Sequence, residues 1–104
     1  MDELTVLTLR AKSGDRRALE EVFQRVRPDV LRLCNYLGQP ADPNDLTQEA
    51  LERALGSLHR FRGEGSARSW FLAIARRTCV DATRLMGRQR NIRAKLVASQ
   101  TSDL

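Results

Sequence analysis

Apolar residues recur at helical spacing along most of this chain. Leu19, Val22, Phe23 and Val26 follow the i, i+3, i+4, i+7 pattern of one helix face. With 104 residues the chain has the size of one domain. Because only 5% of its residues are aromatic, the core has to be built from Leu, Val and Ala, as in many helical bundles. The sequence therefore predicts an all-α fold: a single compact bundle of about four to five helices, with a long basic C-terminal helix.

Capping and turn residues divide the chain into four helical segments. Asp15 is suited to cap the second segment, Asp42-Pro43 to open the third, and Ser66 to cap the last. Pro28 lacks a backbone N–H and clashes with the preceding turn, so the second segment is expected to be two helices or one bent helix. The expected segments are residues 2–12, 15–38, 42–58, and 66 to about 86 or beyond.

The last predicted helix has two different faces when it is projected at 3.6 residues per turn. The apolar face, expected in the core, holds Phe71, Ile74, Ala75, Thr78, Ala82 and Leu85. The opposite face, a basic ridge, holds Ser69, Ala73, Arg76, Arg77, Val80, Arg84 and Arg88. We expect this ridge to grip an anionic polymer.

Positive charge is concentrated in this half of the chain. Residues 1–59 hold 8 Arg or Lys against 10 Asp or Glu, whereas residues 60–95 hold 10 against 2. Such segregation favours nucleic acid as a partner. An anionic membrane is disfavoured because no helix combines this charge with a large exposed apolar face. The bland alternative is a solvated face that keeps the protein soluble.

The predicted helix at 42–58 carries the opposite charge on its outer side. Its buried stripe is expected to hold Thr47, Ala50, Leu51, Ala54 and Leu58. The other side gathers Asp45, Gln48, Glu49 and Glu52. An ordinary wet helix face explains this acidic stripe, and a surface for a basic partner helix is the alternative.

No catalytic constellation is visible in the sequence. There is one His, no GxGxxG or GxxxxGK[ST] phosphate loop and no metal-ligand spacing. We therefore expect a binding protein rather than an enzyme, with no cofactor and no metal. Cys34 and Cys79 are expected to be buried, reduced thiols of a cytoplasmic protein, and a disulfide requires that their helices pack side by side. No signal peptide and no membrane-spanning apolar run is present.

The loop before the last helix combines basic residues with two rings. Gly63 and Gly65 permit turns, and Phe61 and Trp70 flank them. Phosphate contacts together with rings on which an unstacked base can lie are the combination used for single-stranded nucleic acid. Core filling is the alternative for both rings. For Trp70 the two interpretations are evenly balanced, because it projects at the border of the apolar and basic faces.

Residues 45–84 read DLTQEALERALGSLHRFRGEGSARSWFLAIARRTCVDATR. This stretch resembles the region-two signature of bacterial sigma factors of the extracytoplasmic function (ECF) group: an Asp-Leu-x-Gln-Glu helix, a loop with Phe-Arg-Gly-Glu, and a helix with Trp-Leu-x-x-Ile-Ala-Arg. The upstream GDRRALEEVFQRVRPDVLRLCNYLG is similar to the first conserved helices of that family. The resemblance covers residues 4–90, and Phe71 stands where the family often has Leu.

The resemblance implies a helical domain that docks on RNA polymerase core and recognises and melts the promoter −10 element. It allows for an anti-sigma factor as a further partner. The clamp helices of the largest polymerase subunit would meet Asp45, Gln48, Glu49, Glu52 and Arg53. The loop residues that would hold promoter DNA and capture a flipped non-template base are Arg60, Phe61, Arg62, Gly63, Glu64, Ser66, Arg68 and Ser69. The path of the −10 DNA would be lined by Trp70, Arg76, Arg77, Val80 and Arg84.

The resemblance also suggests a domain boundary. Residues 1–90 would form the region 2 domain, and residues 91–104, where apolar periodicity fades, a tail or the start of a linker. The family's C-terminal domain, which reads the −35 element, is missing from this sequence. Two other functions remain open: a helical adaptor that binds only proteins, and a stand-alone repressor of duplex DNA. The repressor is disfavoured because no helix-turn-helix precedes the basic ridge.

Overall fold

The computed structural model describes residues 1–102, and within them it holds four α-helices and one short 3-10 helix. The helices are α1 (Glu3–Lys12), α2 (Arg16–Leu37), α3 (Pro43–Ser57), η1 (Leu58–Arg60) and α4 (Ala67–Ser102). The predicted all-α bundle is confirmed. No helix in this part of the chain is both long enough and apolar enough to cross a membrane.

The helix starts follow the predicted capping residues. The carboxylate of Asp15 accepts a hydrogen bond from the N–H of Ala18 at 3.1 Å, and that of Asp42 accepts one from Asn44 at 2.8 Å. These side chains satisfy backbone donors that the first turn of a helix leaves without a partner. Pro28 does not divide the second segment, because α2 is one continuous helix of 22 residues.

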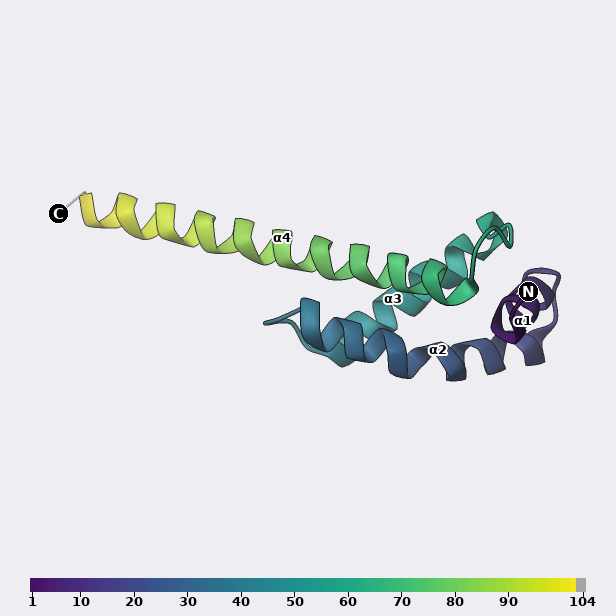
Figure 1. Cartoon of the computed structure of the whole chain (residues 1–104). Coiled ribbons are helices and arrows are strands. Elements are labelled where there is room, and N and C mark those ends of the chain that lie inside the picture. Colours follow the sequence, from purple (N-terminus) through teal and green to yellow (C-terminus); the bar gives the residue numbers. More distant parts are fainter. Residues whose placement is uncertain (103–104) are drawn as a thin grey trace.

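The core lies where α2 packs against α1, α3 and α4. Figure 1 shows α4 running beside α2 and α3, while α1 crosses one end of the bundle near the loop that precedes α4. The buried side chains include Val22, Val26, Val30, Leu46, Ala50, Leu51, Ala54, Phe61, Phe71 and Ala75. The apolar stripes expected for α3 and for the first half of α4 therefore face the core.

The two cysteines lie inside this core on neighbouring helices. Cys34 of α2 and Cys79 of α4 are fully buried and are not joined in a disulfide. Burial, with a hydrogen bond to Cys34, raises the pKa of the Cys79 thiol to about 12. The prediction of buried thiols is confirmed, and the helices do pack side by side.

The last helix, expected to run to about Met86 or beyond, continues to Ser102, beyond the rest of the molecule (Figure 1). The prediction that Leu85 lies in the core is wrong: its side chain is 53% exposed, because the covered face of α4 runs through Ala82 and the half-buried Met86 and leaves Leu85 beside it. Residues 91–102 are helical since this segment holds good helix formers and no Pro. The last two residues of the expected tail lie outside the described part.

Candidate nucleic-acid and protein interfaces

The loop at residues 61–66 is fastened to the bundle at its first residue. The N–H of Phe61 donates to the carbonyl of Leu58 at 3.1 Å, and the carbonyl of Phe61 accepts a hydrogen bond from Lys12 Nζ at 2.7 Å. Gly63 and Gly65 follow with φ of 79° and 80°, a region that favours glycine. The loop therefore has a defined path, with the side chains of Arg62 and Glu64 exposed.

A second group of contacts fixes the start of α4. Ser66 Oγ accepts a hydrogen bond from the N–H of Ser69 at 3.1 Å, which confirms Ser66 as the cap, and it also donates to Ser69 Oγ at 2.8 Å. The N–H of Ala67 donates to Thr5 Oγ1 of α1 at 2.9 Å. The Thr5 hydroxyl in turn donates to the Asp2 carboxylate, at 2.8 Å to Oδ1. Helix α1 thus completes the N-terminal cap of α4.

The aromatic rings flanking the loop form one cluster. The ring centroids of Phe61 and Trp70 lie 5.3 Å apart, those of Trp70 and Phe71 lie 5.1 Å apart, and Phe71 meets Phe23 edge-on at 6.2 Å. Phe61 is only 2% exposed, so its ring supports Trp70 from the core side and is not open to a base. Trp70 is partly buried. The border position inferred for Trp70 is therefore confirmed, and its DNA contact stays a prediction, whereas the burial of Phe61 supports the alternative of core filling for that ring.

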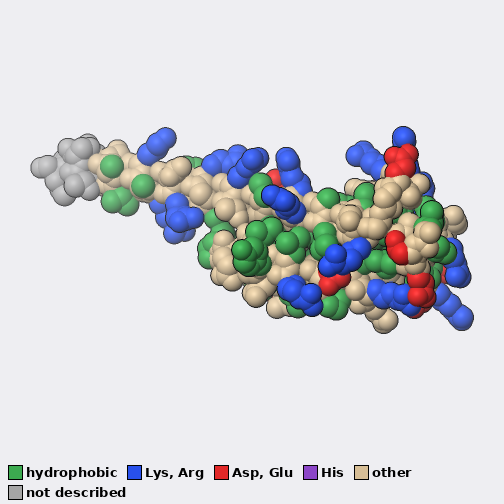
Figure 2. Space-filling view, viewed as in Figure 1, with side chains coloured by type: hydrophobic (Ala, Val, Ile, Leu, Met, Phe, Trp, Pro, Cys, Tyr) green, Lys and Arg blue, Asp and Glu red, His purple; other side chains and the backbone are tan. Residues whose placement is uncertain are grey.

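The basic ridge of α4 is on the surface. Ser69, Ala73, Arg76, Arg77, Arg84 and Arg88 are exposed, and Val80 is partly buried. Figure 2 shows Lys and Arg side chains spaced along this helix. Arg77 pairs with Asp81 at 3.2 Å, and Arg68 pairs with Asp29 of α2 at 3.0 Å. These exposed pairs orient guanidinium groups more than they stabilise the fold.

The acidic side of α3 is also on the surface. Asp45, Gln48, Glu49 and Glu52 are exposed as expected. Arg53, assigned to the same surface, is half-buried and donates to Glu49 at 2.8 Å and to Asp81 of α4 at 2.9 Å. Hydrogen bonding to Arg53 lowers the pKa of Asp81, and the same bond raises the pKa of Arg53. Arg53 therefore joins the acidic surface to the basic ridge.

Sequence reasoning missed the residues that hold the site in place. Thr5, Lys12 and Asp29 come from α1 and α2, and their partners lie 62, 49 and 39 positions away along the chain. No local pattern signals such contacts. The one available hint was Lys12, because it and Lys95 are the only lysines among the basic residues.

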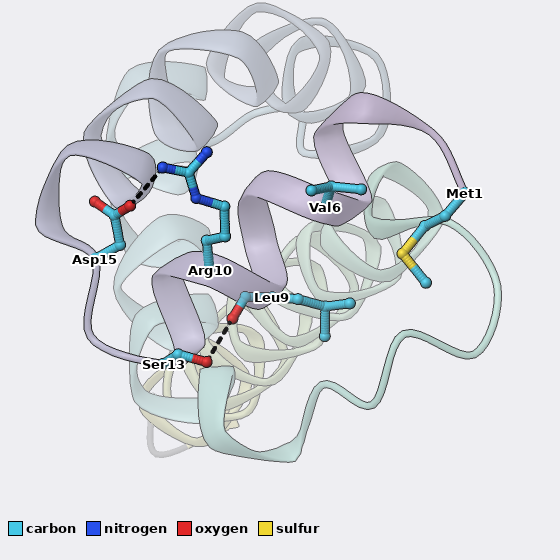
Figure 3. Close-up of a pocket in the computed structure, with 6 residues that line it drawn as sticks. All are labelled: Met1, Val6, Leu9, Arg10, Ser13 and Asp15. Atoms are coloured by element: carbon cyan, nitrogen blue, oxygen red, sulfur yellow. Dashed lines mark hydrogen bonds and ion pairs between the residues drawn. The ribbon is translucent and has the colours of Figure 1, made fainter.

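The outer side of α1 carries a shallow hollow (Figure 3). Met1, Val6, Leu9, Arg10, Ser13 and Asp15 line it. Arg10 pairs with Asp15 at 2.9 Å, and Ser13 Oγ donates to the carbonyl of Leu9 at 3.1 Å. The Leu9 side chain also supports the loop, since a Cβ on Gly63 would lie 3.3 Å from it. The polar groups of this hollow are hydrogen-bonded or ion-paired within α1 and the turn after it, and they form no arrangement suited to catalysis.

Known proteins resemble this chain in both sequence and structure. The family model described as Sigma-70 region 2 matches residues 22–89. The chain is 42% identical over 83 residues to the probable RNA polymerase sigma-C factor of Mycobacterium bovis, covering 80% of this chain and 45% of that protein. It is 33% identical over 109 residues to the ECF RNA polymerase sigma factor SigD of Mycobacterium tuberculosis, covering 97% and 50%. The chain thus spans about half the length of these relatives.

A solved structure shares the fold. It is the NMR structure of an engineered region 2 of sigmaE in complex with GTAAAA. The TM-score is 0.75 at 27% sequence identity, and the alignment covers 86% of this chain and 97% of the other.

Proposed function

The chain belongs to the sigma-70 region 2 family, and on that premise we propose that it binds RNA polymerase core and recognises and melts the promoter −10 element during transcription initiation. Its curated relatives are named as ECF sigma factors. The proposal rests chiefly on the loop at residues 61–66. Backbone groups at both ends of the loop are hydrogen-bonded to α1, and the middle of the loop is exposed. The helix that carries the basic ridge follows directly after it.

The DNA-binding part divides between loop and ridge. The loop, with Arg62 exposed within it and Arg60 exposed just before it, would capture a flipped base of the non-template strand. Flipping a base costs a few kcal/mol of stacking, and ring or pocket contacts of about 1–3 kcal/mol per base offset this cost. Arg76 and Arg84 on the exposed ridge would neutralise phosphates. The sequence bound in the sigmaE complex, GTAAAA, supports a short stretch of DNA as the ligand of this chain.

The polymerase-binding part falls to α3. Its exposed acidic residues suit a basic helical surface such as the clamp helices of the largest polymerase subunit. Arg53 holds Glu49 on one side and Asp81 on the other, so a partner docked on α3 would be coupled directly to the helix that carries the ridge. Residues 1–90 are the proposed region 2 domain. An anti-sigma factor is a further proposed partner.

A protein-only adaptor is the competing function, and promoter opening separates the two. Permanganate footprinting of promoter DNA with RNA polymerase core and this chain reports unpaired thymines. The proposed function predicts reactive thymines in the −10 element that require both chain and core, and weaker reactivity with Trp70→Phe. An adaptor leaves the DNA unreactive, and that result would remove the proposal.

A further inference from the structure

A row of apolar side chains on the second half of α4 has no cover. Leu85, Ile92 and Leu96 are 53%, 59% and 59% exposed. Figure 2 shows hydrophobic side chains on the part of α4 that projects beyond the bundle. A solvent-exposed helix has no need of this pattern, because its surface positions favour polar residues.

The spacing of this row is that of a coiled-coil seam. With Leu85 at position d of a heptad, Gln89 takes position a, Ile92 takes d and Leu96 takes a. The steps of four, three and four residues keep all four side chains on one narrow stripe of the helix. Gln89 is a polar residue at a seam position, a feature that specifies register in paired helices.

The positions that flank the seam carry one sign of charge. Arg88 and Lys95 take position g, Arg93 takes one position e, and the other position e holds the uncharged Met86. All three basic residues are exposed, and residues 82–102 contain no Asp or Glu. Flanking charges set partner choice in coiled coils. A second copy of this helix would place Arg88 against Arg93 in a parallel pair, and like charges in that arrangement repel.

We propose that residues 85–96 of α4 dock an acidic amphipathic helix of a partner protein, with apolar residues at its seam and Glu or Asp beside it. This surface goes beyond the proposed DNA and polymerase contacts, because none of its seam residues is among them and residues 90–96 lie past the range that the family model matches. Nucleic acid explains the basic residues but leaves the exposed apolar row between them without a role.

A synthetic peptide tests the proposal directly. The probe has three heptads with Ile at a, Leu at d and Glu at e and g, and its matched control has the same composition in scrambled order. Isothermal titration calorimetry with the whole chain should show binding of the heptad peptide at least about tenfold tighter than binding of the scrambled one. Equal affinities for the heptad peptide and the scrambled peptide would mean that α4 attracts acidic peptides only by its positive charge. That result would overturn the proposal.

Two variants complete the test without touching the core. Ile92→Asp with Leu96→Asp should abolish binding of the heptad peptide. The triple variant Arg88→Glu, Arg93→Glu and Lys95→Glu should no longer bind the peptide with Glu at e and g. It should instead bind a peptide with Lys at those positions. Unchanged affinity in either variant would contradict the proposal. A dimer of the free chain would also contradict the proposal if sedimentation detects it in the wild type and not in Ile92→Asp. The apolar face would then bind a second copy of the chain.

Discussion

The hydroxyl of Thr5 accepts a hydrogen bond from the backbone N–H of Ala67, at 2.9 Å and across 62 positions of the chain. Lys12 reaches the carbonyl of Phe61 from the same helix. Helix α1 therefore holds both ends of the loop that is proposed to capture a base. This helix precedes the residues that the family model matches, so the defined path of the loop depends on a segment outside the matched region.

Thr5→Val is expected to destabilise the chain by about 1–3 kcal/mol, because it leaves the buried N–H of Ala67 without a partner. Thr8→Val is the matched control. Thr8 is equally buried on the same helix, but its hydroxyl only donates to the carbonyl of Leu4 within α1. Urea unfolding of both variants measures the difference. Equal losses would mean that the contact with α4 adds nothing specific.

The Asp2 cap predicts a loss of stability in acid. Hydrogen bonds from the N–H and hydroxyl of Thr5 lower the pKa of Asp2 from its ordinary value of 3.8. A lowered folded-state pKa means that the carboxylate stabilises the fold above about pH 4, and that this contribution disappears as the pH falls through the lowered pKa. Asp2→Asn keeps a capping oxygen but does not titrate. The gap between the urea midpoints of wild type and variant should narrow below pH 3.8, and a constant gap would refute the assignment.

The acidic surface of α3 predicts a charge-dependent affinity for RNA polymerase core. Glu52→Arg should weaken binding by at least about tenfold, or 1.4 kcal/mol, if this surface meets a basic partner. Glu20→Arg makes the same change at an exposed position of α2 and serves as the control. Competition for core against a labelled sigma factor gives both affinities. If both variants displace the labelled sigma factor from core as well as the wild type does, α3 is not the docking surface.

The buried cysteines predict slow thiol chemistry in the folded chain. The thiolate is the reactive form, and burial raises the pKa of Cys79 to about 12. Ellman's reagent should therefore react with the native chain far more slowly than with the chain in denaturing urea. Rapid reaction of both thiols under native conditions would show that the packing of α2 against α4 opens readily.

The elements that sequence reasoning predicted well depend on neighbouring residues. Asp15 and Asp42 cap their helices through local hydrogen bonds, and the apolar period of α2 and α3 marks faces that are buried or partly buried over most of their length. Leu85 was misplaced because the covered face of α4 runs through Ala82 and the half-buried Met86 and leaves Leu85 exposed beside it. Periodicity marks an apolar face but does not say what covers it.

The site was predictable in its composition and not in its geometry. The basic ridge and the acidic stripe follow from helix projection, and both are exposed. The burial of Phe61 and the tie between Arg53 and Asp81 depend on which helices meet. These contacts join residues far apart in the chain, and a single sequence holds no signal for them.

Loop and ridge together are proposed to hold single-stranded DNA. Fluorescence anisotropy at low salt tests this with a labelled oligonucleotide that contains GTAAAA, in single-stranded form and as a longer duplex. We predict salt-sensitive binding that prefers the single strand, at least about tenfold weaker for Arg76→Ala with Arg84→Ala because two phosphate contacts are lost. Arg93→Ala, outside the proposed site on the same helix, should change the affinity less than about twofold. No binding of the single strand at low salt, or equal affinity of the wild type and both variants, would show that loop and ridge do not bind DNA in this way.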